Sequence, residues 1–337
     1  MIIGHGDDIY NQDNKIVWNF SSNVDTHQDL SALRAYITTC IHQIHSYPEP
    51  DAGSLARVLA EKNGVNQTNL AITNGATEAI YLIAQAFAQA KTAIIIPTFS
   101  EYEDACQINQ HQLSYYSHLS EVHEELDLIW LCNPNNPTGY TYSKEYLLKF
   151  INLHPKTVFV IDQSYEHFCR EELFTMLDSK SISNLILLHS MTKHFAIPGL
   201  RLGYLSSSEN LINKINYFRM PWAVNQLAIE AGKFLETQYD NLVDVEKLLE
   251  NAHILKKELA KMDELEVSPT TTHFFMCCIK DKHRTAQDLK EFLVKNYGIL
   301  IRDASNFRGL TPQHFRVAAQ NKEANNVLIK AIKEWIS

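Results

Sequence analysis

Lys193 is the residue of this sequence whose surroundings best suit covalent chemistry. It lies in Ser190-Met191-Thr192-Lys193, apolar residues flank it, and Arg201 follows eight positions later. A lone lysine is usually a solvated surface charge, but an amine held near another cation loses its proton more easily and becomes a nucleophile. Ser190 and Arg201 are suited to hold a phosphate while Lys193 bonds to an aldehyde carbon.

Three further polar clusters each follow a short apolar run. They read N-G-A-T-E at 74–78, N-P-N-N-P-T-G at 133–139 and D-Q-S-Y at 162–165. Free N–H groups at a helix start attract phosphate, two prolines and a glycine fix a rigid loop, and Asp162 in a dry cleft needs a cationic partner. Each cluster alone also fits a helix cap or a turn, but doubled asparagine inside N-P-x-N-P-T-G is unusual for a mere turn.

The apolar runs before these clusters alternate with helical patterns. The runs are nearly continuous in Ile, Val and Leu, which is typical of strands buried on both faces of a mostly parallel sheet. They cover 70–73, 93–96, 128–132, 158–161 and 185–188, and helical spacing covers 77–90, 146–151 and 211–217. Ligands bind outside the carboxyl ends of the strands in open α/β sheets, so we expect the four clusters to meet in one cleft.

The pattern changes after about residue 208. Long helical and charge-rich sequence is followed by two apolar runs that alternate with helices, which predicts a smaller α/β domain. The helical patterns cover 242–262, 286–297 and 322–336, and the apolar runs cover 273–279 and 299–302.

Composition argues against several classes of protein. The formal net charge is -9 and the Lys and Arg residues are scattered, whereas a nucleic-acid partner favours a basic stripe. Six cysteines without a C-x-x-C pair indicate reduced thiols in a cytoplasmic protein, and the fifteen histidines show no metal-ligand spacing. The N-terminus lacks a signal-peptide pattern, and no run approaches the roughly 20 apolar residues of a membrane span. We therefore expect neither a metal nor a membrane partner.

The ordered set N-G-A-T-E, N-P-N-N-P-T-G, D-x-x-Y and S-x-T-K-(x)7-R resembles the fold-type I aminotransferase family, whose members use pyridoxal 5'-phosphate. The resemblance covers essentially the whole chain, and the four motifs agree in order and separation. It implies an α/β fold with a mostly parallel central sheet in a large cofactor-binding domain and a smaller α/β domain. We expect an N-terminal arm at 1–45 that joins the small domain and covers the active site, the large domain at 46–235 and the small domain at 236–337.

The resemblance implies roles for the residues around the cofactor ring. Lys193 resembles the lysine that holds the cofactor as a Schiff base and also moves protons. Asp162 is expected to pair with the pyridine nitrogen and keep it protonated. Asn136 and Tyr165 are expected to donate hydrogen bonds to the phenolic oxygen of the ring.

Other residues are expected, on the same resemblance, to hold the ring face and the cofactor phosphate. Phe99 would stack on the ring, with Tyr102 as the second choice. Tyr47 resembles a tyrosine that reaches the phosphate in the neighbouring subunit, which implies a homodimer with shared active sites. The phosphate would lie at the helix start and at the lysine motif, on Gly75, Ala76, Thr77, Ser190, Thr192 and Arg201.

Two arginines are expected to bind a small phosphorylated amino-acid substrate. Arg316, in H-F-R-V, resembles the family arginine that grips the substrate α-carboxylate, a task that suits a planar fork. Arg302 resembles a second arginine that binds a distal phosphate. By the same resemblance, the substrate contacts would come from His5, Gly6, Asn23, Asn136, Arg302 and Arg316.

Two enzyme types in the family use such a phosphate site: the threonine-phosphate decarboxylases of cobalamin biosynthesis and the histidinol-phosphate aminotransferases. The decarboxylase is favoured by H-G at 5–6, M-P-W-A-V-N at 220–225 and T-K-H-F-A-I-P-G-L-R at 192–201. The long gap between Arg302 and Arg316 also favours it. We expect decarboxylation of L-threonine O-3-phosphate to (R)-1-amino-2-propanol O-2-phosphate.

Two residues depart from the decarboxylase pattern. Tyr165 stands where phenylalanine is expected, and Arg308 stands where proline is common. Tyr165 is typical of the aminotransferases, so 2-oxoglutarate-dependent amino transfer from histidinol phosphate is the alternative. A third hypothesis is a binding or regulatory protein without turnover, but the retained lysine, aspartate and arginine of the motifs argue against it.

Overall fold

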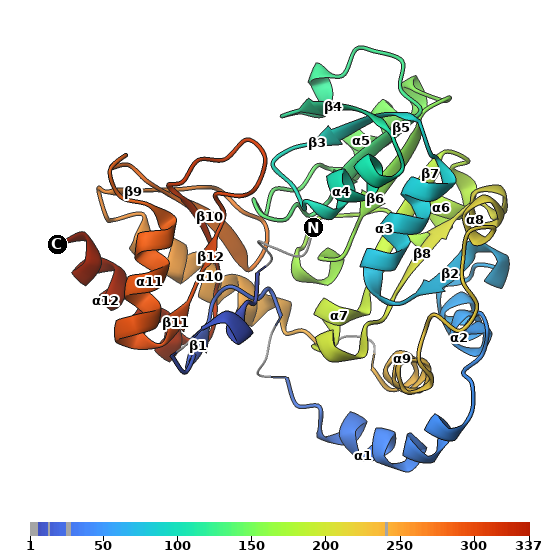
Figure 1. Cartoon of the computed structure of the whole chain (residues 1–337), viewed down its shortest axis with the longest axis horizontal. Helices are drawn as coiled ribbons and strands as arrows, with labels where there is room; N and C mark the ends of the chain where they lie inside the picture. Colours follow the sequence, from blue (N-terminus) through green and yellow to red (C-terminus); the bar gives the residue numbers. More distant parts are fainter. Residues whose placement is uncertain (1–5, 13, 25–27, 240–241) are drawn as a thin grey trace.

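A seven-stranded sheet forms the centre of the computed structural model, which describes residues 6–12, 14–24, 28–239 and 242–337 (Figure 1). Its strand order is β2-β8-β7-β6-β5-β3-β4. Neighbouring strands from β7 to β4 are parallel, and only β8 pairs antiparallel with its neighbours among the described strands of this sheet. The strands are β2 (Leu70–Thr73), β3 (Lys91–Ile95), β4 (Gln112–Tyr116), β5 (Leu128–Cys132), β6 (Val158–Asp162), β7 (Leu185–Ser190) and β8 (Gly203–Ser207). The predicted mostly parallel sheet is confirmed.

Strand β5 shows why the sheet is covered on both faces. Successive side chains point to opposite faces of a strand, so Leu128 and Trp130 share one face while Ile129 and Leu131 share the other. All four are buried. The first pair packs in a core with α3 and α4, and the second pair packs in a core with α5. These helices are α3 (Gly75–Ala86), α4 (Glu101–Ile108) and α5 (Lys144–Leu153).

Further helices complete the large unit. Leu33, Leu55 and Leu235 join the core at the β2 end of the sheet, where α1, α2 and α9 pack together. The helices are α1 (Ser31–Cys40), α2 (Gly53–Asn63), α6 (Met176–Ser181), α7 (Met191–His194), α8 (Glu209–Asn216) and α9 (Gln226–Gln238). Short 3-10 turns are η1 (Ile9–Asn11), η2 (Ile41–His45), η3 (Gln67–Asn69), η4 (Leu119–Glu121), η5 (Glu166–Phe168) and η6 (Pro198–Leu200). No helix in the described part of the chain combines the length and apolar character that crossing a membrane requires.

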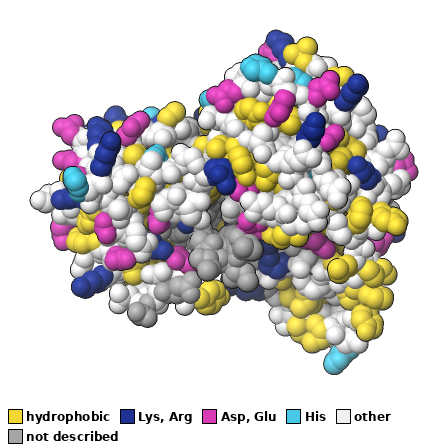
Figure 2. Space-filling view, turned by 45° about the horizontal axis from the view of Figure 1, so that its top comes forward, with side chains coloured by type: hydrophobic (Ala, Val, Ile, Leu, Met, Phe, Trp, Pro, Cys, Tyr) yellow, Lys and Arg dark blue, Asp and Glu magenta, His cyan; other side chains and the backbone are white. Residues whose placement is uncertain are grey.

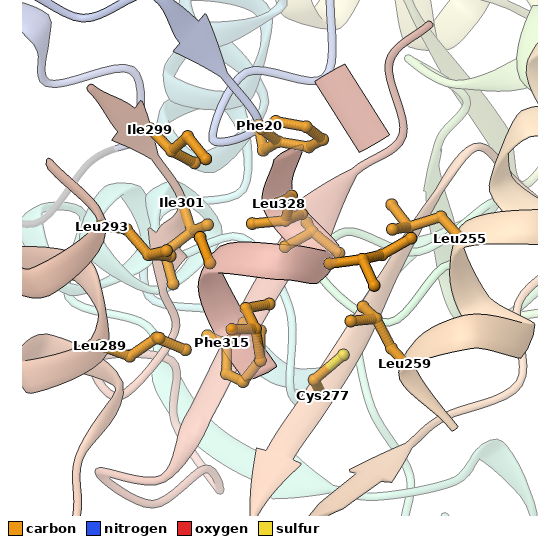
Figure 3. Close-up of a cluster of buried hydrophobic side chains, with 14 of the residues drawn as sticks. Phe20, Leu255, Leu259, Cys277, Leu289, Leu293, Ile299, Ile301, Phe315 and Leu328 are labelled. Atoms are coloured by element: carbon orange, nitrogen blue, oxygen red, sulfur yellow. The ribbon is translucent and has the colours of Figure 1, made fainter. Parts of the chain in front are cut away.

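A second, four-stranded antiparallel sheet of order β12-β13-β10-β9 forms the smaller unit. Its core brings Phe315 and Cys277 of the sheet against Leu255, Leu289 and Leu328 of the helices (Figure 3). The elements are β9 (Leu265–Val267), β10 (Phe274–Ile279), β12 (Arg302–Asp303), β13 (His314–Ala318), α10 (Val245–Leu259), α11 (Ala286–Tyr297) and α12 (Lys322–Ile336). A smaller α/β unit is therefore present, with α10 as its first helix, while α8 and α9 pack in the cores of the large unit.

The N-terminal segment belongs to the smaller unit before the chain crosses to α1. Strand β1 (Trp18–Asn19) pairs in parallel with β11 (Ile299–Leu300). The Phe20 N–H donates to the Leu300 carbonyl at 2.8 Å, and the Ala318 N–H donates to the Phe20 carbonyl at 2.9 Å. The Phe20 ring is fully buried in the core of the smaller unit. The arm expected at 1–45 joins this unit at Phe20, while the domain boundaries at 45/46 and 235/236 stay predictions.

Candidate active site

A cavity of about 260 Å³ lies at the carboxyl ends of the parallel strands, between the two sheets. It collects side chains from both units and from the N-terminal segment. Most of the predicted site residues line it, namely Gly6, Asn23, Ala76, Thr77, Phe99, Asn136, Asp162, Tyr165, Ser190, Thr192, Lys193, Arg201, Arg302 and Arg316. The four motifs therefore meet in one cleft, as expected.

The first turn of α3 forms one end of the cavity. Gly75 has φ +75, and a Cβ added there would lie 2.6 Å from Nη2 of Arg201. Glycine therefore lets the guanidinium lie directly against the backbone of the turn. The Ala76 and Thr77 N–H groups belong to this first turn, where helix N–H groups have no carbonyl partner within the helix. N–H groups and a cation together make this end suited to a phosphate.

Lys193 lies on α7, the short helix that begins directly after β7. Ser190 and Thr192 line the cavity on the same turn. Burial, together with the nearby cations Arg316 and Arg201, lowers the pKa of Lys193 to about 8, while Asp7 and Asp162 act in the opposite direction. The amine is therefore partly neutral near physiological pH, which makes it available as a nucleophile.

Asp162 ends β6 and is held by two hydrogen bonds. Its Oδ2 accepts from the Tyr102 hydroxyl at 2.6 Å, and its Oδ1 accepts from the Ser164 N–H at 2.8 Å. The carboxyl group is buried with 4% of the residue exposed. Tyr102 is fully buried and stacks on Trp130 with the ring centroids 5.0 Å apart. A carboxylate fixed in this way has a defined orientation and suits a cationic ring nitrogen.

The two aromatic candidates for ring stacking lie in different places. Tyr102 lies beneath the cavity as the hydrogen-bond partner of Asp162. Phe99 is half-buried at the cavity wall and meets Tyr102 edge to face, with centroids 5.9 Å apart. Both residues line the cavity, and ring stacking by Phe99, with Tyr102 as the second choice, stays a prediction.

The three asparagines of the 133–139 loop have separate tasks. Asn133 exchanges two hydrogen bonds with the backbone of Tyr142, and Asn135 donates to the Pro97 carbonyl at 2.9 Å. These bonds fix the loop, so that Asn136 faces the cavity. Gly139 closes the loop with φ +71, and a Cβ there would lie 2.0 Å from Oγ1 of Thr270 in the smaller unit. The loop thus positions one amide and also touches the second unit.

Arg316 lies on β13 and is buried, with 5% of the residue exposed. Its Nη1 donates to Oδ1 of Asn136, and its Nη2 donates to the Ser21 carbonyl at 2.5 Å. Its Nε is buried without a hydrogen-bond partner among the described residues. Burial lowers the pKa of this guanidinium to about 10, and Tyr165 only partly offsets the effect. A buried cation with an unused donor is suited to bind an anionic group.

Arg302 lies on β12 and lines the cavity. It donates to Oδ1 of Asn306 at 2.8 Å and lies over the Phe307 ring, 5.1 Å from the centroid. A Cβ added at Gly6 would lie 3.2 Å from Cδ of Arg302, so the N-terminal segment passes close to this arginine. Burial lowers the pKa of Arg302, while Asp303 acts in the opposite direction.

Asn23 and Tyr165 lie side by side at the back of the cavity. Only 2% of Asn23 is exposed, and both atoms of its amide lack a hydrogen-bond partner among the described residues. Leaving such a group unpaired is costly, so a polar ligand atom is expected beside it. Burial raises the pKa of Tyr165 to about 12, although the nearby cation Arg316 acts to lower it. The hydroxyl stays protonated and can donate a hydrogen bond.

Among the described residues predicted for the site, Gly75 and Tyr47 do not line this cavity. Tyr47 is 83% exposed and packs against Trp222, with ring centroids 5.2 Å apart. Its predicted contact is with a neighbouring subunit, so exposure on its own chain is compatible with that role. His5 lies outside the described residues.

Sequence reasoning missed several lining residues. Asp7 and Ser21 are linked, because the Asp7 N–H donates to Ser21 Oγ at 3.1 Å. Ser21 begins S-S-N directly after buried Phe20, and this pattern of polar residues after an apolar run matches the other clusters. The same rule applied there finds Ser21. Asn306 and Phe307 come from an irregular loop with no such signal.

The residues present fit the cofactor that the sequence resemblance implies. The cradle that a Cβ at Gly75 would fill suits the phosphate of pyridoxal 5'-phosphate. Asp162 suits the pyridine nitrogen, and the amine of Lys193 suits the aldehyde carbon. Among the described residues, no three His, Cys, Asp or Glu side chains form a metal-binding group.

The chain is similar in sequence and in fold to proteins of one known family. Residues 15–332 match the family described as aminotransferase class I and II. The crystal structure of L-threonine-O-3-phosphate decarboxylase from Porphyromonas gingivalis is 39% identical, with a TM-score of 0.92 over 95% of this chain and 99% of that chain. A Caldanaerobacter subterraneus relative, provisionally named threonine-phosphate decarboxylase, is 35% identical over 85% of this chain and 82% of its own length. A histidinol-phosphate aminotransferase from Thermoanaerobacter sp. is 32% identical over 87% of this chain and 85% of its own.

Proposed function

This chain belongs to the aminotransferase class I and II family, and we propose that it removes carbon dioxide from L-threonine O-3-phosphate. The product would be (R)-1-amino-2-propanol O-2-phosphate, a precursor for cobalamin biosynthesis. Enzymes of the family use pyridoxal 5'-phosphate. The similar decarboxylase of known structure supports the proposal, because the two chains match over nearly their full lengths.

The observation that carries the proposal is the arrangement of three arginines in one cavity. Arg201 lies against the first turn of α3, where we place the cofactor phosphate. Arg302 and Arg316 face each other across β12 and β13, which leaves two further cations for the substrate. L-Threonine O-3-phosphate carries a carboxylate and a phosphate, so its charges match this pair. An amino acid with an uncharged side chain would leave one arginine without an anion.

The chain's own residues would orient the substrate and move the proton. Pyridoxal 5'-phosphate, when bound, supplies an electron sink for the bond that breaks at the substrate α-carbon. Arg302 would hold the distal phosphate and so rotate the substrate until the bond to its carboxylate is the one that breaks. Asp162 would keep the pyridine nitrogen protonated. The amine of Lys193, which lies in the cavity, would return a proton to the substrate α-carbon after carbon dioxide leaves.

Amino transfer from histidinol phosphate is the second candidate, and Tyr165 favours it. Tyr165 replaces the phenylalanine expected in the decarboxylase, and its buried hydroxyl lines the cavity. Histidinol-phosphate aminotransferases are also among the similar proteins. This reaction needs 2-oxoglutarate to regenerate the cofactor, whereas decarboxylation does not.

A homodimer is part of the proposal because of the surface around Tyr47. Large hydrophobic side chains are exposed there, including Ile41, Ile44, Met220 and Trp222. Figure 2 shows hydrophobic side chains gathered at the lower right of the molecule, over the part that holds α1 and η2. An apolar surface of this kind is typical of a protein interface. We also propose a cytoplasmic location, supported by six free cysteines.

The test uses purified enzyme loaded with cofactor. Release of carbon dioxide from L-threonine O-3-phosphate, without 2-oxoglutarate, is the expected result. Rapid amino transfer from histidinol phosphate to 2-oxoglutarate, with no carbon dioxide released, would replace the first candidate by the second. A protein that binds the cofactor and turns over neither substrate would instead be a binding protein.

A further inference from the structure

We propose that Glu103 and Arg308 form an ion pair between the two units that positions Arg302 for the substrate phosphate. Neither residue lines the cavity, so their effect would reach the substrate through the loop that carries Arg308. The inference rests on the proposed function in one respect, namely that the substrate carries a distal phosphate. Both candidate substrates meet that condition.

Arg308 and Glu103 form a bidentate ion pair. Nε of Arg308 donates to Oε2 of Glu103 at 2.9 Å, and Nη2 donates to Oε1 at 2.6 Å. The guanidinium also lies over the Tyr115 ring, 4.2 Å from the centroid. Glu103 lies on α4 and Tyr115 on the edge strand β4, both in the large unit, whereas Arg308 lies in the β12–β13 loop of the smaller unit. The pair therefore fixes the loop against the other unit.

The loop connects this contact to Arg302. Asn306 and Phe307, which directly precede Arg308, both line the cavity. Asn306 accepts a hydrogen bond from Nη2 of Arg302 at 2.8 Å, and the Phe307 ring lies under the same guanidinium. The loop is tight, because the Phe307 N–H donates to the Ala304 carbonyl at 3.1 Å. A shift of Arg308 would therefore move two of the groups that contact the Arg302 guanidinium.

Glu103, the partner of Arg308, lies on the helix that follows Phe99, a residue of the cavity wall in the large unit. Glu103 is on the first turn of α4, four residues after Phe99. Its hydrogen bonds from Arg308 lower the pKa of its carboxyl group, so it stays ionised at physiological pH. An exposed ion pair commonly adds little to stability, and half of the Arg308 side chain is exposed. We therefore assign the pair a positioning role between the Phe99 wall and the Arg302 wall.

The central experiment is a double-mutant cycle on the loaded enzyme. Glu103→Gln, Arg308→Met and the double variant should each raise KM for L-threonine O-3-phosphate about tenfold, with kcat changed less than threefold. The double variant should match the single variants, since each breaks the same pair. Arg308→Lys keeps the positive charge but cannot form the bidentate hydrogen bond, so its affinity should lie between that of Arg308→Met and that of the unchanged enzyme. Binding of L-threonine, which lacks the phosphate, should be unchanged in all variants when measured by calorimetry.

A second readout does not depend on activity. Trypsin cleaves after arginine, and the Arg308–Gly309 bond becomes easier to reach when the loop is released. Glu103→Gln should therefore be cut at this bond several times faster than the unchanged enzyme. The matched control is Glu145→Gln, which breaks the exposed Glu145–Lys149 pair at 2.7 Å on α5 and should leave KM and cleavage unchanged.

Several results would overturn the inference. They are an unchanged KM in the variants, faster tryptic cleavage without any change in KM, or an equal loss of affinity for phosphorylated and unphosphorylated ligands. Failure of the proposed function looks different, because the unchanged enzyme would then release no carbon dioxide. In that case the same KM comparison is made with histidinol phosphate, and the inference stands or falls on that result.

Discussion

Arg302 and Arg316 are direct partners in the register of β12 and β13, so two guanidinium groups enter one cavity from neighbouring strands. Two like charges at this separation repel each other, and burial removes the water that would screen them. The nearby Arg302 accordingly contributes to lowering the pKa of Arg316. An anion bound in the cavity would offset this repulsion, so the arrangement of the two arginines favours an anionic substrate.

Replacing Arg302 by methionine should reduce affinity for the phosphorylated substrate. Charge-assisted hydrogen bonds contribute about 1.5–3 kcal/mol each, so KM for L-threonine O-3-phosphate should rise roughly 10- to 100-fold. Steady-state release of carbon dioxide measures this change. Arg284→Met, at an arginine that packs on Trp335 away from the cavity, is the control and should leave KM unchanged. Equal KM values for both variants would remove Arg302 from the proposed site.

Replacing Asp162 by asparagine should lower turnover. Asparagine keeps one oxygen, which can accept from either Tyr102 or Ser164, and it loses the charge that is proposed to keep the pyridine nitrogen protonated. We expect kcat to fall at least about 100-fold, which corresponds to about 2.7 kcal/mol. Tyr102→Phe removes one hydrogen bond and keeps the charge, so its loss should be much smaller. A Tyr102→Phe variant as slow as Asp162→Asn would contradict this order.

The pH dependence of cofactor capture should follow Lys193. Only the neutral amine attacks an aldehyde, and the pKa of this amine is lowered to about 8. The rate at which the cofactor-free protein binds pyridoxal 5'-phosphate should therefore rise with pH through about 8 and level off above it. A stopped-flow absorbance trace measures the rate. Removal of Arg316 takes away a nearby cation, so Arg316→Met should move the midpoint to higher pH, and a midpoint that moves lower would refute the assignment.

A half-buried carboxylate, that of Glu166, should make stability sensitive to acid. Glu166 accepts a hydrogen bond from Nδ1 of His189 at 2.8 Å. Burial alone would raise the pKa of Glu166, but His189 and His167 lower it to about 2. Because this folded-state pKa is below the ordinary carboxyl value, the contribution to stability is present above about pH 4.5 and is lost as the pH falls towards 2.

Urea unfolding of a His189→Ala variant tests this contribution. The variant leaves the half-buried Glu166 carboxylate without its main partner, although Gln163 still donates to it, and this should cost about 1–3 kcal/mol at pH 7. Replacing both residues, as Glu166→Gln with His189→Ala, removes the charge and should recover part of that loss. A single variant as stable as the unchanged protein would show that this pair contributes little.

The sequence predicted the strands whose residues are apolar throughout. The runs at 70–73, 128–132 and 185–188 match β2, β5 and β7 closely. Strand β8 was missed because it reads G-Y-L-S-S, and its two serines are buried with hydrogen-bonded hydroxyls: Ser206 pairs with Ser179, and Ser207 donates to the Leu185 carbonyl. Strand β4, at the sheet edge, is half-exposed and mixes polar with aromatic residues. The buried serines of β8 are satisfied by hydrogen bonds to residues distant in the sequence, so this strand lacks the apolar run by which the other strands were predicted.

The candidate site was predictable where a motif carries the residue. Lys193, Asp162 and Asn136 each lie in a short pattern of fixed spacing, and all three line the cavity. Contacts between the two units were not predictable from the sequence. Arg308 was noted only as a departure from the family pattern, and its partner Glu103 lies about two hundred positions away in an unremarked helix. Pairs of this kind depend on how the two units are arranged in space.

The contact at Gly139 limits how this chain can change over evolutionary time. Any side chain at position 139 would collide with Oγ1 of Thr270, and no rotamer of the new residue relieves a clash at Cβ itself. The Phe274 carbonyl would also lie only 2.7 Å from such a Cβ, so a larger residue at 139 would require the backbone near residue 274 to move as well as a change at Thr270. Substitutions at these positions are therefore expected to be coupled.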